Sequence, residues 1–161
     1  MKIVILGCGR IGAILACRLS QTGHDVAIID VDNSAFQRLG PDFKGKRVLG
    51  NGTEQDTLRR AGIEQADCFL AITQGDNRNI MACQIARVIF NVPRVQTRIK
   101  DPLRADCFAE QGLETFCTTI LAANYLEHLL LFGPGASGAP AAGSASSSED
   151  RSVPDSVGSE A

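Results

Sequence analysis

Short apolar runs alternate with stretches of helical periodicity along the first 132 residues of the chain. The runs have the length and composition of buried strands, and they lie at 3–6, 26–29, 47–49, 68–72, 94–99 and 115–117. Between them, apolar residues recur at helical spacing at 11–20, 33–39, 57–61, 79–90 and 103–110. Alternating strands and helices indicate a parallel sheet with helices on both faces, because right-handed crossovers place each helix over the sheet. We therefore predict an α/β fold with a Rossmann-like, doubly wound, six-stranded parallel sheet.

The composition changes sharply after residue 132. Gly, Pro, Ser and Ala fill 22 of the 29 positions from 133 to 161, and this stretch has no aromatic residue. Such a composition buries too little apolar surface to offset the entropy of the chain. We predict three regions: a folded domain at 1–118, a helix at 119–132 and a disordered, low-complexity tail at 133–161.

Charge and hydropathy exclude several classes of protein. The chain has 16 Lys and Arg against 18 Asp and Glu, a net charge of −2, so no global basic field favours nucleic acid. The apolar segment 118–132 is interrupted by Asn124, Glu127 and His128, and it is shorter than the roughly 20 apolar residues of a spanning helix. The N-terminus leads into the first strand without the pattern of a secretory signal. We expect a soluble cytoplasmic protein that binds no nucleic acid and does not insert into a membrane.

The six cysteines show no CxxC spacing and have no histidine nearby at metal-ligand distance. We expect them to be reduced, with most of them acting as small core residues. Cys8 differs because it lies in a glycine turn at the start of a predicted helix, where a thiolate is favoured. A redox sensor is therefore the alternative interpretation at Cys8.

A glycine motif follows the first strand and opens the first helix. In this context a GxGxxG motif binds a dinucleotide: its first glycine permits the tight turn and its second lets the backbone approach a pyrophosphate. The third glycine allows the helix to pack closely on the strand, and phosphate then meets the helix N-terminus. The residues of the motif are Gly7, Cys8, Gly9, Arg10, Ile11 and Gly12.

The second predicted strand ends in Asp30, 18 residues after Gly12. This spacing suits a carboxylate that accepts hydrogen bonds from ribose hydroxyls, and its charge would repel the 2′-phosphate of NADP. NAD(H) and ATP or ADP all present a free ribose, so the choice between them stays open. A merely solvated Asp30 is the alternative. Arg10 either contacts a phosphate in its own or a neighbouring subunit, or is an ordinary charge at a helix start.

Further motifs occur in a fixed order along residues 1–130, and together with the glycine motif and Asp30 they are far more specific than a glycine turn alone. The chain thereby resembles the RCK/KTN (TrkA-N) family, the N-terminal nucleotide-binding domains of Trk and Ktr potassium-uptake regulators. The motifs are Gly50-Asn51-Gly52-Thr53; Leu58 with Ala61-Gly62-Ile63 and Ala66-Asp67; Ala71-Ile72-Thr73 with Asp76 and Asn79; Ala82-Cys83-Gln84-Ile85-Ala86 with Phe90-Asn91; and Arg98-Ile99.

The resemblance implies further nucleotide contacts. Gly52 and Thr53 follow the third predicted strand, and Thr73 and Gln74 follow the fourth, at the sheet edge where such folds bind ligands. The resemblance makes these four residues adenine or ribose contacts and also places Arg98 at the nucleotide. The alternatives are an N-cap at Thr53, a turn residue at Thr73 and a surface salt bridge at Arg98. We expect Asp76 and Asn79 to cap the following helix instead of binding ligand.

The apolar positions of segment 118–132 can share one helix face. The segment resembles the family's crossover helix, which packs on a partner subunit and implies a homodimer or larger ring. A helix that folds back on its own domain is the alternative. The sequence departs from the family where its C-terminal regulatory domain would follow, because the low-complexity tail stands there.

The resemblance implies a regulator without enzymatic activity. Nucleotide binding would rearrange paired domains, and their assembly would gate a separate membrane potassium transporter from the inner face of the membrane. One alternative is a small NAD-dependent dehydrogenase or its detached cofactor domain, but His24 and His128 form no evident triad or metal cluster. Another is a nucleotide-sensing adaptor for a different partner.

Overall fold

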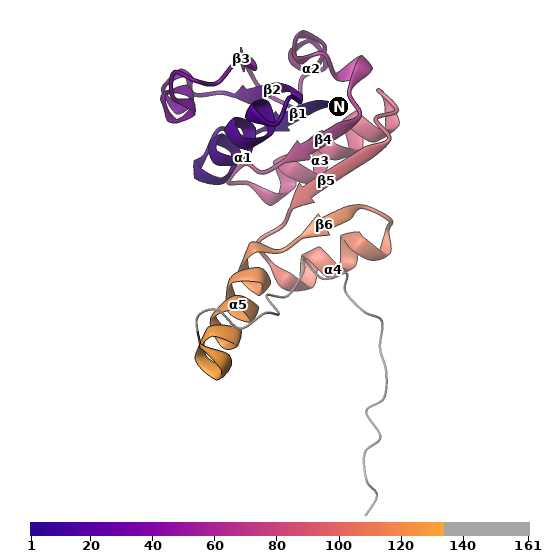
Figure 1. Cartoon of the computed structure of the whole chain (residues 1–161). Helices are drawn as coiled ribbons and strands as arrows, with labels where there is room; N and C mark the ends of the chain where they lie inside the picture. The colour runs from indigo at the N-terminus through magenta and orange to yellow at the C-terminus, as the bar shows by residue number, and fades with distance from the viewer. Residues whose placement is uncertain (134–161) are drawn as a thin grey trace, which may run out of the picture.

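Six parallel strands form one sheet in the computed structural model, which describes residues 1–133 (Figure 1). Their spatial order is β3-β2-β1-β4-β5-β6, and every neighbouring pair is parallel. This arrangement confirms the predicted doubly wound α/β sheet. The strands are β1 (Lys2–Leu6), β2 (Asp25–Asp30), β3 (Lys46–Leu49), β4 (Cys68–Ala71), β5 (Arg94–Arg98) and β6 (Glu114–Phe116). Apart from Gly133, the tail predicted at 133–161 lies outside the described residues.

The connections between the strands are helical, as the periodicity predicts. The α-helices are α1 (Arg10–Gln21), α2 (Gln55–Ala61), α3 (Asp76–Val88), α4 (Pro102–Glu110) and α5 (Thr118–Phe132). The described residues also form two short 3₁₀ helices, η1 (Asn33–Leu39) and η2 (Ile63–Gln65). The segment predicted as a helix at 33–39 is thus a 3₁₀ helix, which begins where the Asp32 carboxylate accepts the Ser34 N–H at 2.8 Å.

Alternate residues of each central strand pack into two separate cores, one on each face of the sheet. In β1, Val4 and Leu6 belong to the core that includes residues of α2, α3 and α4, whereas Ile3 and Ile5 belong to the core that includes residues of α1 and η1. Such alternation follows from the two-residue period of a strand, and it explains why the central strands read as continuous apolar runs. Helices therefore cover both faces, as predicted.

The strand order reverses at β1: the strands that follow it along the chain extend first to one side of β1, as β2 and β3, and then to the other, as β4, β5 and β6. Because β1 lies between β2 and β4, the connections leaving β1 and β4 diverge to opposite faces of the sheet. Ligands of open α/β sheets bind at such a point, outside the carboxyl ends of the strands. The glycine motif occupies this position because it directly follows β1.

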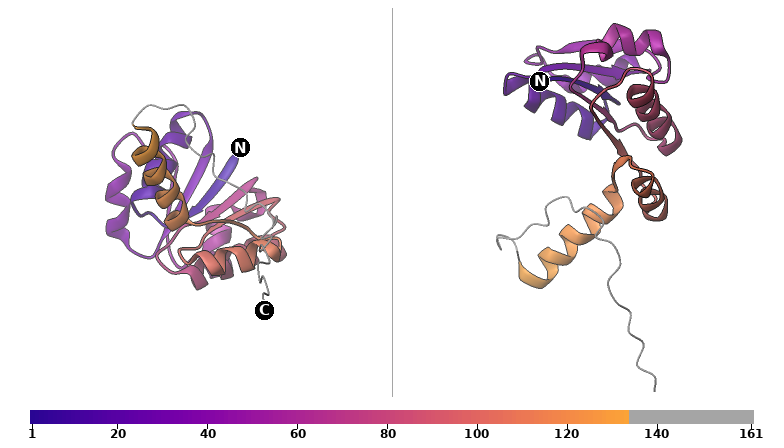
Figure 2. Two further views of the ribbon diagram at one scale, coloured as in Figure 1. Left: turned by 90° about the horizontal axis from the view of Figure 1, so that it is seen from below. Right: turned by 90° about the vertical axis from the view of Figure 1, so that its right-hand side faces the viewer.

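The last helix, α5, extends away from the sheet (Figures 1 and 2). None of its residues is buried, although Leu126, Leu130 and Phe132 are large and apolar. The helix therefore does not fold back on its own domain. Within residues 1–133, no helix has the length and apolar character needed to cross a bilayer.

Two Leu to Ala substitutions test the assignment of the core. Leu58 in α2 is fully buried, whereas Leu103 in α4 is 81% exposed. We expect Leu58→Ala to lower the free energy of unfolding by about 2–5 kcal/mol, because it leaves a cavity in the core. Leu103→Ala, the matched control, should change it by less than about 0.5 kcal/mol. Urea denaturation measures both, and equal effects would contradict the packing.

Candidate functional site

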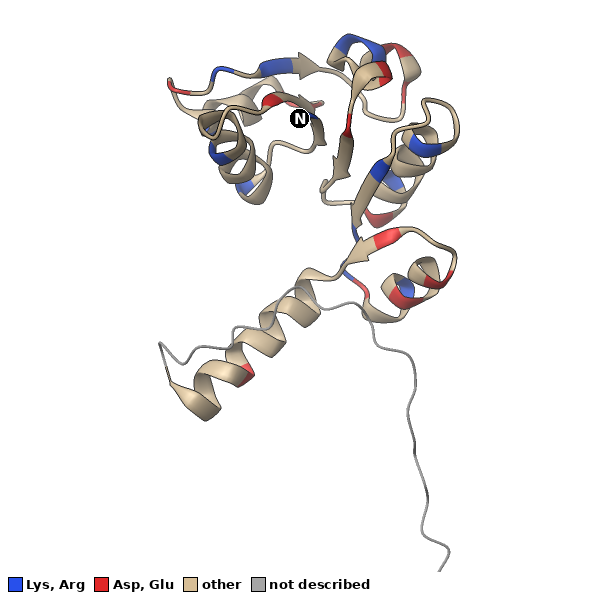
Figure 3. Cartoon of the chain, turned by 45° about the vertical axis from the view of Figure 1, so that its right-hand side comes forward, with Lys and Arg blue, Asp and Glu red and all other residues tan. Residues whose placement is uncertain are grey.

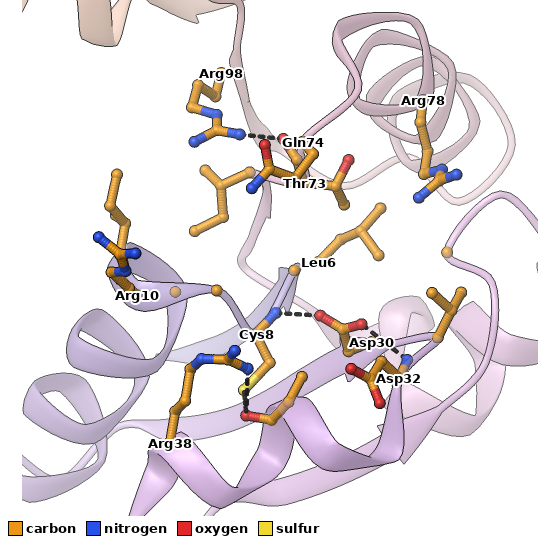
Figure 4. A pocket seen from close by; sticks show the side chains of 18 residues that line it. Leu6, Cys8, Arg10, Asp30, Asp32, Arg38, Thr73, Gln74, Arg78 and Arg98 are labelled. Atoms are coloured by element: carbon orange, nitrogen blue, oxygen red, sulfur yellow. Dashed lines mark hydrogen bonds between the residues drawn. The ribbon is translucent and has the colours of Figure 1, made fainter.

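A cavity of about 620 Å³ opens at the carboxyl ends of β1, β2, β4 and β5 (Figure 4). Its position is the one that the strand order predicts for a ligand. It brings together eleven of the twelve site residues predicted from the sequence, and Thr53 is the exception. The eleven are Gly7, Cys8, Gly9, Arg10, Ile11, Gly12, Asp30, Gly52, Thr73, Gln74 and Arg98.

Each of the three glycines of the motif occupies its position for a different structural reason. Gly7 has a φ of +110°, which L side chains rarely adopt. A Cβ at Gly12 would lie 2.0 Å from the Gly7 carbonyl oxygen, so only glycine allows α1 to approach β1 this closely. At Gly9 a Cβ would meet nothing within 4 Å, and this residue lines the cavity. The loop thus packs tightly against the domain at Gly7 and Gly12, and it has free space on the side of the cavity at Gly9.

The start of α1 is suited to bind an anion. Gly9 is the N-cap and supplies no side-chain hydrogen bond to the helix. The N–H groups of a first helical turn have no acceptor within the helix, and the helix dipole is positive at this end. Because Gly9, Arg10 and Ile11 all line the cavity, these N–H groups are available for phosphate oxygens.

Asp30 braces the glycine loop. One of its carboxylate oxygens accepts the Cys8 N–H at 2.7 Å, and the other accepts the Asp32 N–H at 3.0 Å (Figure 4). The side chain is therefore half-buried and fixed, not simply solvated. A carboxylate has about four acceptor positions, so it retains capacity for the ribose hydroxyls predicted to bind there.

The ends of β4 and β5 are held by a buried amide. Asn79 is fully buried, and its Oδ1 accepts both the Thr73 N–H at 2.8 Å and the Thr73 hydroxyl at 2.7 Å. Its Nδ2 donates to the carbonyl oxygens of Thr73 and Arg98, at 3.1 and 3.0 Å. The Arg98 guanidinium also donates to the Thr73 carbonyl oxygen, and among the described residues it forms no salt bridge.

Three polar residues do not have the structural roles that the sequence predicted for them. Thr53 donates its N–H and hydroxyl to Asn51 Oδ1, at 3.2 and 2.9 Å, and it is not the N-cap of α2, which is Glu54. Asp76 and Asn79 are not caps either, because α3 begins at Asp76 with Gly75 as its N-cap. The cap prediction is wrong because the helix starts three residues before the predicted position at 79, which places both residues in its first turn.

The cavity has an excess of positive charge that the sequence did not reveal. Arg38 and Arg78 line it together with Arg10 and Arg98, and within residues 1–133 none of the four pairs with a carboxylate. Only two carboxylates line it, so four positive charges against two negative ones leave a net charge of +2. The lining residues absent from the sequence prediction are Leu6, Val31, Asp32, Ala35, Arg38, Ile72 and Arg78.

Asp32 remains ionised beside these arginines. The Ser34 hydroxyl and backbone N–H both donate to its carboxylate, and they lower the pKa of Asp32 below its usual value. Asp30 and Asp32 therefore form an acidic edge at the end of β2, whereas Arg10 and Arg38 lie at the glycine loop and Arg98 lies at the ends of β4 and β5 (Figure 4). This distribution suits a ligand with hydroxyl groups at one end and phosphates in its middle.

Cys8 does not act as a thiolate. It is fully buried, and its Sγ donates to the Ala35 carbonyl oxygen at 3.3 Å. Burial, followed by the negative charge of Asp30, raises the pKa of Cys8 to about 11, so the thiol is protonated at neutral pH. These surroundings do not favour the thiolate that the redox interpretation of Cys8 requires. All six cysteines are free in the structure.

Known proteins share both the sequence motifs and the fold. Residues 3–119 match the model of the TrkA-N domain family. The chain is 50% identical over 131 residues to the Trk system potassium uptake protein TrkA of Streptomyces coelicolor, and the match covers 81% of this chain and 59% of that protein. The chain thus spans less than two thirds of the length of this relative.

Two solved structures resemble the domain. The TrkA-N domain of the inner membrane protein ybaL from Escherichia coli has a TM-score of 0.71 at 18% identity and covers 80% of this chain and 96% of its own. At this identity the likeness establishes the shared fold. The structure of GsuK bound to ADP has a TM-score of 0.67 at 27% identity, covering 80% of this chain and 33% of its own. The family match over 117 residues and the 50% identity to a TrkA protein show that the chain belongs to the TrkA-N domain family.

Proposed function

We propose that the cavity binds an adenine nucleotide, NAD(H) or ATP/ADP. The observation that carries this proposal is that four arginines without a salt bridge among the described residues line the same cavity as the glycine loop and the uncapped start of α1. Phosphate oxygens would satisfy both the arginines and the free N–H groups. The ADP bound to the related GsuK domain supports the same ligand class.

The polarity of the cavity suggests how the ligand lies. The adenosine ribose would contact Asp30, and the diphosphate would lie over Gly9 at the start of α1. The rest of the ligand, a terminal phosphate or the second nucleoside of NAD, would extend toward Thr73, Gln74 and Arg98. Arg10 is exposed at the start of α1, where it can reach a phosphate in its own or in a neighbouring cavity.

We further propose that this domain regulates a separate membrane potassium transporter or channel of Trk or Ktr type at the cytoplasmic face of the membrane. The name of the Streptomyces relative supports potassium uptake as the process. A nucleotide can shift the arrangement of the domains only if it binds the two arrangements with different affinity. A difference of about 5- to 150-fold supplies about 1–3 kcal/mol per site, and several sites in an assembly would add.

The exposed face of α5 supports assembly with a second copy. Leu130 and Phe132 are 86% and 67% exposed, and Glu127 is the only Asp, Glu, Lys or Arg of the helix (Figure 3). An apolar helix surface of this kind is costly in water and is typical of an interface. We propose that α5 pairs subunits in a homodimer or larger ring.

An NAD-dependent dehydrogenase, or a detached cofactor domain, is the less favoured function. Hydride transfer requires an acid or base that faces the nicotinamide. His24 lies in the turn before β2, at the opposite end of the strands from the cavity, and His128 lies in α5. Because neither histidine lines the cavity, we propose a regulatory domain without enzymatic activity.

A charge introduced into the phosphate position tests the ligand site. Gly9→Asp leaves the fold intact, because a Cβ there meets nothing within 4 Å, but it fills and repels the phosphate position. We expect ADP affinity, measured by calorimetry, to fall by about tenfold or more. Gly75→Asp is the matched control, since Gly75 precedes α3 outside the cavity lining, and it should bind as the wild type does. Unchanged ADP affinity in Gly9→Asp would contradict the site.

The acidic edge predicts a preference among dinucleotides. Asp30 would face a 2′-phosphate with a like charge, so we expect NADP to bind about tenfold more weakly than NAD, or worse. Competition against a fluorescent adenine nucleotide measures the ratio. Equal affinities for NAD and NADP would show that Asp30 does not contact the ribose.

Two leucines of similar exposure test the role of α5. Leu130 in α5 is 86% exposed and Leu103 in α4 is 81% exposed. If α5 pairs subunits, Leu130→Asp buries an unpaired charge and should raise the dissociation constant of the dimer by about tenfold or more. Leu103→Asp should not change it. Light scattering across a concentration series compares the variants, and a monomeric wild type at high concentration would refute the pairing.

A further inference from the structure

The hydrogen-bonded ladder between β4 and β5 ends before the cavity. Its last paired residues are Ala71 and Thr97, and β4 ends at Ala71, two residues before Thr73. Beyond this point the Asn79 side chain links the two strand ends, because its amide group hydrogen-bonds to Thr73 on one side and to the Arg98 carbonyl oxygen on the other. The two strand ends are therefore linked by this side chain of α3, together with the Arg98 guanidinium, which donates to the Thr73 carbonyl oxygen.

This arrangement fixes Arg98 from two sides. Its carbonyl oxygen accepts from Asn79 Nδ2 at 3.0 Å, and its guanidinium donates to the Thr73 carbonyl oxygen. Its Nε is buried and has no hydrogen-bond partner. Because a buried donor without a partner is costly, an anionic ligand in the cavity would draw this guanidinium toward itself. Any movement of the side chain then acts on Thr73 and on the end of β5.

The next part of the chain connects the end of β5 to α5. The Lys100 N–H donates to an Asp76 carboxylate oxygen at 3.1 Å. The Lys100 carbonyl oxygen accepts the Thr119 hydroxyl at 2.9 Å and the Cys117 thiol at 3.3 Å. Lys100 follows Arg98 by two residues, so its backbone stands between the cavity and the first turn of α5. The second Asp76 oxygen is buried without a hydrogen-bond partner.

We propose that Asn79 is a positioning residue that couples the cavity to α5 through Arg98 and the Lys100 backbone, an inference that rests on the proposed nucleotide binding. Ligand phosphates attract Arg98, Asn79 makes the ends of β4 and β5 move together, and the Lys100 carbonyl oxygen transmits the shift to Thr119. The direction in which α5 leaves the domain thereby depends on the ligand. Asn79 itself does not line the cavity.

Hydrogen exchange of the full 161-residue chain, with and without saturating ADP, tests this coupling. In the wild type we expect ADP to change the exchange of the amides from 117 to 126 as well as those of the glycine loop. Thr119→Val removes the hydroxyl donor but touches nothing in the cavity. It should keep ADP affinity within about threefold of the wild type and lose more than about half of the ADP-dependent change in α5.

Two further variants sharpen the result. Thr118→Val, in the same helical turn, is the matched control, because Thr118 makes no side-chain hydrogen bond among the described residues, and it should keep the full effect. Asn79→Asp places an oxygen against two carbonyl oxygens and should lower ADP affinity by about tenfold. It should also abolish the change in α5.

The outcomes separate this inference from the proposed function. Binding of ADP that leaves α5 exchange unchanged in the wild type, or a change that persists in Thr119→Val, would overturn the coupling and leave nucleotide binding intact. A wild-type chain that binds none of ADP, ATP and NAD would overturn the proposed function itself.

Discussion

The close approach of α1 to the end of β1 determines the site. A side chain at Gly12 would meet the Gly7 carbonyl oxygen at 2.0 Å, so the helix can reach this position only with glycine there. The approach directs the first turn of α1 at the cavity and leaves Gly9 open to it. Asp30 then holds the loop from β2 through the Cys8 N–H. Each feature of the phosphate position depends on this one contact between helix and strand.

Around this fixed centre, two carboxylates and four arginines line the cavity. The carboxylates occupy the end of β2, Arg10 and Arg38 lie at the glycine loop, and the other two arginines come from α3 and β5. An arginine without a carboxylate partner can form charge-assisted hydrogen bonds with an anion without breaking a salt bridge. The same residues that would bind a nucleotide also border the hydrogen bonds that lead to α5. In the proposed function, binding and assembly would therefore be connected through the ends of two neighbouring strands.

Most of the fold could be predicted from the sequence, because buried parallel strands are continuous apolar runs and the glycine motif has a fixed place between strand and helix. The site could be predicted less completely. The polar residues 76–78 hid the true start of α3, and Arg78 and the position of Asn79 were missed with it. Arg38 reaches the cavity from a 3₁₀ helix, and Asn79 acts across two strands. Such contacts depend on tertiary packing, which the local periodicity of the sequence does not predict.

A crystal structure of the chain grown with ADP tests the central claim most directly. The account predicts the diphosphate over the first turn of α1, with its oxygens within hydrogen-bond distance of the backbone N–H groups that follow Gly9, and a ribose hydroxyl on the Asp30 carboxylate. A structure at saturating ADP in which the nucleotide binds elsewhere, or in which side chains fill the space above Gly9, would contradict it.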